Sequence, residues 1–153
     1  MDQVIEHSIK QILDSLGVSY QGIEHTTVAG QRVFSIQTDE SRSLIGPHGD
    51  MIHAIDYLVK KIVDHEVEKA GAGKIEPFLV DVAEYRSKQI KDLAVKAVMM
   101  AERARSFRYD VELSPMTAYE RLIVHAALAN EPHVKTESQG EGRGRRVVIK
   151  YVE

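Results

Sequence analysis

The chain has no cysteine, no tryptophan and only 3 phenylalanines among its 153 residues. The absence of cysteine excludes disulfides, thiolate nucleophiles and metal sites held by thiolates. The longest uninterrupted apolar run, residues 97–101, is far shorter than the roughly 20 residues that cross a bilayer. Residues 1–10 also lack the basic and apolar regions of a secretory signal. We therefore expect a cytoplasmic protein that does not insert into a membrane.

The net charge of −3 conceals two parts of opposite sign. Residues 1–84 hold 7 Lys and Arg against 14 Asp and Glu, a charge of −7, whereas residues 85–153 hold 13 against 9, a charge of +4. A basic second part favours a nucleic-acid surface there, although such an imbalance also arises by chance. Charge alone does not distinguish a nucleic-acid surface from a chance imbalance, so the sequence motifs are needed to separate these two interpretations.

Helical and strand patterns alternate along the first half. Ile5, Ile9 and Leu13 fall on one helical stripe, and Gly17 is placed to end that helix in a left-handed conformation. The expected elements are a helix at 2–16, strands at 18–28 and 32–38, a short helix at 41–45, a helix opening at Asp50, a flexible connection at 70–73 and a strand at 77–83.

The second half opens with the strongest helical pattern, an apolar stripe from Ile90 to Ala101. Thr117 and Glu120 have the spacing of a capping box, which opens a further helix that Pro132 ends. The remaining expected elements are strands at 109–113, 134–139 and 145–152, the last two joined by a glycine-rich loop at 140–144. The fold class predicted from both halves is α+β in two small domains.

Two glycines separated by two residues join the helices on either side of residue 47. Glycines without a Cβ let a backbone approach another polymer, and the following helix points free N–H groups at the loop. Apolar residues on both sides would wall a groove for unstacked bases. The same spacing also suits a tight corner that binds nothing. The candidate binding residues are Ile45, Gly46, Pro47, His48, Gly49 and Ile52.

This glycine pattern and the order of the surrounding elements resemble a KH domain of the type II topology, with helices on a three-stranded sheet. The resemblance covers about residues 2–83, so we place the KH domain at 1–83. It implies that the loop clamps the backbone of four nucleotides of single-stranded RNA or DNA. The two central positions, often basic in the family, are Pro47 and His48 here. The loop must therefore rely on backbone N–H groups and on partial protonation of His48.

Arg121 and His125 lie four residues apart on an otherwise apolar helix, so both side chains emerge on one face. In one interpretation Arg121 pairs with a carboxylate and His125 satisfies a hydrogen bond in the core. In the other, Arg121 offers a planar fork to a phosphate and His125 donates beside it or stacks on a base.

A basic hairpin follows that helix. Its charges are either a solvated sheet edge or a surface that follows a phosphate backbone. The residues concerned are Arg143, Arg145, Arg146 and Lys150.

The Arg-x-x-x-His pattern resembles an R-three-H domain when its flanks are included, Pro115 and Glu120 before it and residues 136–138 after it. The resemblance places this domain at 84–153, with two helices on a small, mainly antiparallel sheet. It implies binding of single-stranded nucleic acid, with Arg121 and His125 as the residues that name the family.

A KH domain followed by an R-three-H domain is similar to the Jag family, also called the SpoIIIJ-associated proteins. The resemblance implies a bacterial cytoplasmic RNA-binding protein that regulates cell-envelope or division processes, including cell shape. It also implies a small KH-domain partner protein or self-association, with single-stranded DNA as a second ligand. The sequence shows no counterpart of the further N-terminal domain and charged linker that many members carry, so we expect no membrane-proximal role.

Two other functions stay open. One is a protein–protein adaptor whose acidic KH half has lost strong RNA binding. The other is a metal-dependent hydrolase built on His48, Asp50, His53 and Asp56, but only two of these share a helix face, and three ligands are needed. We therefore expect no catalysis, no cofactor, no metal and no small-molecule substrate.

Overall fold

The computed structural model describes residues 1–153, which divide into two compact units, Met1–Ser87 and Lys88–Glu153. Each unit packs helices against a sheet of three strands, which confirms the predicted α+β class. Helix α4 (Tyr85–Phe107) begins in the first unit and continues in the second. The domain boundary after residue 83 stays a prediction.

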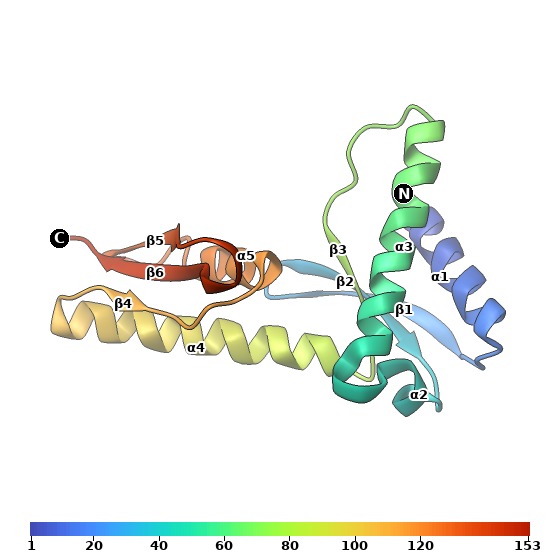
Figure 1. The fold of residues 1–153 in the computed structure, drawn as a ribbon, viewed down its shortest axis with the longest axis horizontal. Coiled ribbons are helices and arrows are strands. Elements are labelled where there is room, and N and C mark those ends of the chain that lie inside the picture. Colours follow the sequence, from blue (N-terminus) through green and yellow to red (C-terminus); the bar gives the residue numbers. More distant parts are fainter. The chain divides into compact units, whose positions relative to one another are not determined.

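The first unit has the order helix, strand, strand, helix, helix, strand (Figure 1). Its central strand β2 pairs antiparallel with β1 and parallel with β3. The predicted order is confirmed, although β1 begins four residues later than expected. The elements are α1 (Asp2–Leu16), β1 (Gly22–Val28), β2 (Gln31–Gln37), α2 (Ser41–Ile45), α3 (Asp50–Lys69) and β3 (Phe78–Val82).

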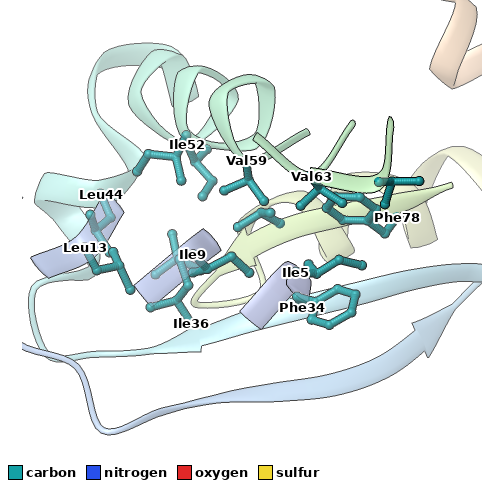
Figure 2. Packing of buried hydrophobic residues seen from close by; sticks show 14 residues of the cluster. Ile5, Ile9, Leu13, Phe34, Ile36, Leu44, Ile52, Val59, Val63 and Phe78 are labelled. Atoms are coloured by element: carbon teal, nitrogen blue, oxygen red, sulfur yellow. The ribbon is translucent and has the colours of Figure 1, made fainter. Parts of the chain in front are cut away.

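Apolar residues of α1 and α3 face the sheet and form the first core. Figure 2 shows Ile9 of α1 and Val59 of α3 pointing toward the side chains of β2, where Phe34 is 1% exposed. Helix α1 ends as predicted, because Gly17 takes the left-handed conformation at φ 67 and its N–H donates to Asp14. This packing holds α3, and with it the glycine loop at its start, against the sheet.

A fully buried carboxylate connects β3 to the start of α4. Asp81 accepts the backbone N–H groups of Arg86 at 2.9 Å and Ser87 at 2.8 Å, and the Ser87 hydroxyl at 2.6 Å. The first N–H groups of a helix have no partner inside it, so this carboxylate replaces the usual N-cap side chain. Between these residues Ala83 and Glu84 both adopt positive φ, at 50 and 56.

The second unit has an antiparallel sheet in the order β4-β6-β5, beside α4 and α5 (Figure 1). Ala97, Ala101 and Ala104 of α4 are wholly buried, and their small side chains let the helix approach the sheet closely. The capping box of Thr117 and Glu120 is confirmed. The elements are β4 (Val111–Glu112), α5 (Ala118–Ala127), β5 (Val134–Gln139) and β6 (Arg146–Tyr151).

Candidate nucleic-acid interface

His125 is held by two hydroxyl groups of β5. Its Nδ1 lies 2.6 Å from Thr136 Oγ1 and its Nε2 lies 2.9 Å from Ser138 Oγ. Alternate residues of a strand share one face, which explains why both hydroxyls reach the same ring. A neutral imidazole has one donor and one acceptor nitrogen, so one hydroxyl accepts and the other donates. The orientation of the ring is therefore fixed before any ligand arrives.

The pKa of His125 is lowered from its ordinary value, first because partial burial disfavours the charged ring and second because the Arg121 guanidinium repels it. The ring is therefore neutral at pH 7. It offers a polarised aromatic surface, and the positive charge of the pair belongs to Arg121.

Arg121 Nη1 donates to the carbonyl oxygen of Met116 at 3.0 Å, and its guanidinium forms no ion pair. The structural alternative in which a carboxylate neutralises Arg121 is therefore wrong. A guanidinium has five N–H donors, so one bond to a carbonyl leaves most of the fork for a phosphate. The bond to Met116 also fixes the direction of the side chain.

Two cations of the hairpin are already paired. Arg146 Nε lies 2.7 Å from Glu112 Oε2, and Lys150 Nζ lies 2.5 Å from Glu137 Oε2. These pairs lower the pKa of both carboxyl groups through hydrogen bonds and charge, and they raise the pKa of Lys150. Much of the positive potential expected from these two side chains is therefore offset.

The register of β5 and β6 separates these cations from His125. Thr136 and Ser138 stand opposite Ile149 and Val147, whereas Lys150 stands opposite Lys135. Residues directly opposite in an antiparallel pair share a face, and successive residues alternate between faces. Lys150, and Arg146 four residues before it, therefore lie on the other face of the sheet from the hydroxyls that hold His125. The expected basic hairpin does not form one continuous surface with Arg121.

The other two arginines of the hairpin are exposed. Arg145 Nη1 donates to Gly140 O at 3.2 Å, and Arg143 lies in the exposed turn Gly142–Gly144. Neither forms an ion pair, so both keep their charge available to an anion.

In the first unit, the two loop glycines are required by local packing. Gly46 has φ 69, and a Cβ there would lie 2.8 Å from Met51 Cβ. Gly49 has φ 78, and a Cβ there would lie 2.6 Å from the ring of Tyr85. Both positions thus need glycine for backbone conformation and for space. The glycine spacing builds a tight corner between α2 and α3 whether or not it also contacts a ligand.

Pro47 and His48 form the exposed tip of this corner, and His48 has φ 53. Ile45 is partly buried against the core, and Ile52 is 0% exposed within it. The structure therefore places Ile52 where it cannot wall an exposed groove, because the first turn of α3 directs it inward.

Arg42 is a basic residue beside the loop that the sequence reasoning missed. Its carbonyl accepts the N–H of Gly46 at 3.1 Å, and its exposed side chain forms no ion pair. The signal that could have found it is its position one helical turn before the first glycine, which puts a basic residue next to a loop whose Pro47 and His48 supply no fixed charge.

The four residues of the hydrolase alternative do not form a metal site, since no three His, Asp or Glu side chains lie together in a group that could hold an ion. Asp56 is instead 7% exposed and accepts the Val80 N–H at 2.9 Å, while its other oxygen lies 2.8 Å from Lys60 Nζ and 3.2 Å from Arg86 Nη1. It is a structural carboxylate.

A hollow of about 600 Å³ lies between α1 and α3, and none of the candidate residues lines it. Val4, His7, Ile62 and Glu66 are among its lining. None of the helices combines the length with the apolar character of a membrane-spanning segment.

The family model of the R-three-H domain matches residues 91–151. The chain is 30% identical over 149 residues to the RNA-binding protein KhpB of Clostridium symbiosum. The aligned region covers 97% of this chain and 64% of that protein. It is 34% identical over 122 residues to RNA-binding protein KhpB of Lactiplantibacillus plantarum, covering 78% of this chain and 36% of that protein. The protein of the same name from Bacillus subtilis is 28% identical over 120 residues, 77% of this chain and 55% of that protein. The chain thus spans less than two thirds of the length of each of these relatives.

Proposed function

We propose that this chain, a Jag-type protein with an R-three-H domain, binds single-stranded RNA and catalyses no reaction. The relatives named as RNA-binding proteins match it over most of its length. The acidic total charge does not oppose this function, because the second part of the chain is basic.

The proposal rests mainly on one observation: Arg121 is charged and has no acidic partner, whereas its neighbour His125 is neutral and held in place. Arg121 has no acidic partner and is held by a single carbonyl, while His125 is neutral and oriented by two hydroxyls. A guanidinium without an acidic partner can bind a phosphate, and a neutral ring of fixed orientation can contact a base or sugar. We assign the phosphate to Arg121 and a stacking contact to His125, because both ring nitrogens of His125 already bond to hydroxyl groups.

Two further regions contribute charge or shape. Arg143 and Arg145 extend the cationic region at the hairpin turn, whereas the paired Arg146 and Lys150 contribute less. In the first unit, the backbone of Gly46–Gly49 with the exposed Arg42 contacts a second stretch of nucleotides. We expect this second contact to be weaker, because residues 1–84 carry a charge of −7.

The biological role is a second part of the proposal. The family resemblance favours a cytoplasmic regulator that acts after transcription, in cell-envelope or division processes. A small KH-domain protein, or a second copy of this chain, is the partner we propose, and single-stranded DNA is a weaker ligand.

The adaptor function remains the second candidate, because the tip of the glycine loop carries no fixed cation and its own half is acidic. It predicts a protein that binds a protein partner and no nucleic acid.

Binding of a fluorescent 12-nucleotide uridine RNA, followed by anisotropy at 50 to 200 mM salt, separates the two functions. RNA binding should weaken linearly on logarithmic axes, with a slope of about −0.7 per neutralised phosphate. A variant that combines Arg121→Ala and His125→Ala should lose most of the affinity, while the matched control Lys135→Ala, on the other face of β5, should keep it. Absence of binding by the wild type at the lowest salt would favour the adaptor.

A further inference from the structure

Two aromatic rings stand exposed at the end of α4, away from any core. Phe107 is 67% exposed and Tyr109 is 41% exposed. Their centroids are 5.9 Å apart and their planes differ by 37°. Large apolar rings normally leave solvent when the fold allows it, so a pair left in water calls for an explanation.

The backbone holds this pair in place. Arg108, between the rings, has φ 53, and the N–H of Tyr109 donates to Ala104 O at 3.3 Å. This is the bond of a helix that ends through a left-handed residue, where glycine is the unstrained choice. The chain uses arginine there instead, which leaves the backbone strained.

Hydrogen bonding fixes the second ring. Arg103 Nε donates to the Tyr109 hydroxyl at 2.8 Å, which joins the last turn of α4 to the ring beyond it. The Tyr109 ring therefore has a defined orientation before a ligand binds.

The charges around the rings favour an anionic partner. Neither Arg103 nor Arg108 forms an ion pair, whereas Arg105 is paired with Glu131 at 2.6 Å. The nearby acids are Glu102 and Asp110, and Asp110 accepts the Tyr151 N–H at 3.0 Å. Two guanidinium groups without acidic partners beside two exposed rings combine the features that bind the backbone and the bases of a single strand.

We propose that Phe107 and Tyr109, flanked by Arg103 and Arg108, form a stacking site for unpaired bases of single-stranded RNA. This inference rests on the proposed function and adds a second site to it within the same unit. Val111, two residues after Tyr109, lies in one row of the sheet with Ile149 and Thr136. Two strand spacings, about 10 Å, therefore separate β4, which follows this site in the chain, from β5, which holds His125.

The test uses the absence of tryptophan from the chain. Phe107→Trp introduces the only tryptophan, and its emission reports stacking directly because a base in contact with an indole quenches it. The 12-nucleotide uridine RNA should quench this emission. Inorganic polyphosphate, which has the charge but no bases, should leave it unchanged. Equal quenching by both probes would overturn the stacking site.

Affinity for the same RNA gives the second readout. Phe107→Ala should bind roughly 5- to 100-fold more weakly, the range found when a stacking aromatic is truncated. Met99→Ala, also on α4 and 57% exposed, is the matched control and should bind like the wild type. Because Phe107 is exposed and packs in no core cluster, both variants should fold, which circular dichroism checks.

The possible failures differ from one another. If the wild type binds RNA, Arg121→Ala weakens it and Phe107→Ala does not, the stacking site is wrong and the proposed function stands. If Phe107→Ala changes the mass of the protein assembly in sedimentation but leaves its RNA affinity unchanged, the rings form a protein–protein contact and the inference is overturned. If no variant binds RNA at low salt, the proposed function and the stacking site fail together.

Discussion

The Oγ1 atom of Thr136 lies 2.6 Å from Nδ1 of His125, and this contact fixes which way the imidazole of α5 points. The ring would otherwise rotate about its side-chain bonds. Because β5 supplies the contact, the site depends on the second sheet as much as on the helix that carries Arg121.

Replacing that hydroxyl should weaken the site without unfolding the protein. Thr136→Val keeps the shape of the side chain and leaves Nδ1 without a partner, which should cost about 1 to 2 kcal/mol of unfolding free energy and lower RNA affinity. Thr136→Ser keeps the hydroxyl and should behave like the wild type. Urea unfolding and anisotropy measure the two effects, and equal behaviour of the two variants would show that the hydroxyl has no such role.

The lowered pKa of His125 predicts a pH dependence of stability. As the pH falls below about 6.5, the unfolded chain takes up the proton before the folded chain does, so this residue destabilises the fold in acid. The free energy of unfolding should therefore decrease less between pH 7.5 and 5.5 in His125→Gln than in the wild type. Urea unfolding at both pH values measures the difference, and the same decrease in both proteins would exclude His125 as its source.

A direct check of the same cause is an NMR titration of the His125 ring. Arg121→Gln removes the repelling charge, so the pKa of His125 should rise toward its ordinary value. An unchanged or lower pKa in this variant would contradict the role given to Arg121.

The buried carboxylate of Asp81 should be essential for the first unit. Asp81→Ala leaves the N–H groups of Arg86 and Ser87 unsatisfied in the interior, which should cost on the order of 3 kcal/mol. Asp64→Ala, on the exposed side of α3, is the control. Urea unfolding followed through amide NMR signals of the first unit gives the result, and a similar small loss in both variants would count against the capping role.

The glycine loop gives a conformational prediction. Gly49→Ala combines an unfavourable φ with a clash against Tyr85 and should destabilise the first unit by about 2 to 4 kcal/mol. Adding Tyr85→Ala removes the clash, so the double variant should lose less than the two single losses added together. A Cβ added at Gly73 would have no atom within 4 Å, and Gly73 has no positive φ, so Gly73→Ala should cause no loss of stability. Strict additivity would show that the two side chains do not compete for space.

Local patterns were sufficient to predict several parts of the fold. Gly17 marked the end of α1, Thr117 and Glu120 marked the start of α5, and the four-residue spacing put Arg121 and His125 on one face. These features depend on neighbours within one or two helical turns, which the sequence displays directly.

Long-range relationships could not be predicted in the same way. The pairing of Lys150 with Glu137 depends on the register of β5 and β6, and a shift of one residue would reverse the faces. The burial of Ile52 depends on how α3 rotates against the sheet. Asp81 lies in β3, six residues before Ser87, and caps α4 from there. The sequence next to the helix therefore contains no capping pattern that predicts this contact.

If the proposed function is correct, RNA binds on the face of Arg121 and His125 and not simply wherever the second unit is basic. The most direct measurement compares Arg121→Ala with Lys150→Ala, each of which removes one positive charge, by anisotropy with the 12-nucleotide RNA at equal salt. We predict that Arg121→Ala weakens binding about 10- to 100-fold, as expected for a lost hydrogen bond to a charged group, and that Lys150→Ala stays within about twofold of the wild type. Equal losses in the two variants, or a larger loss in Lys150→Ala, would contradict the account.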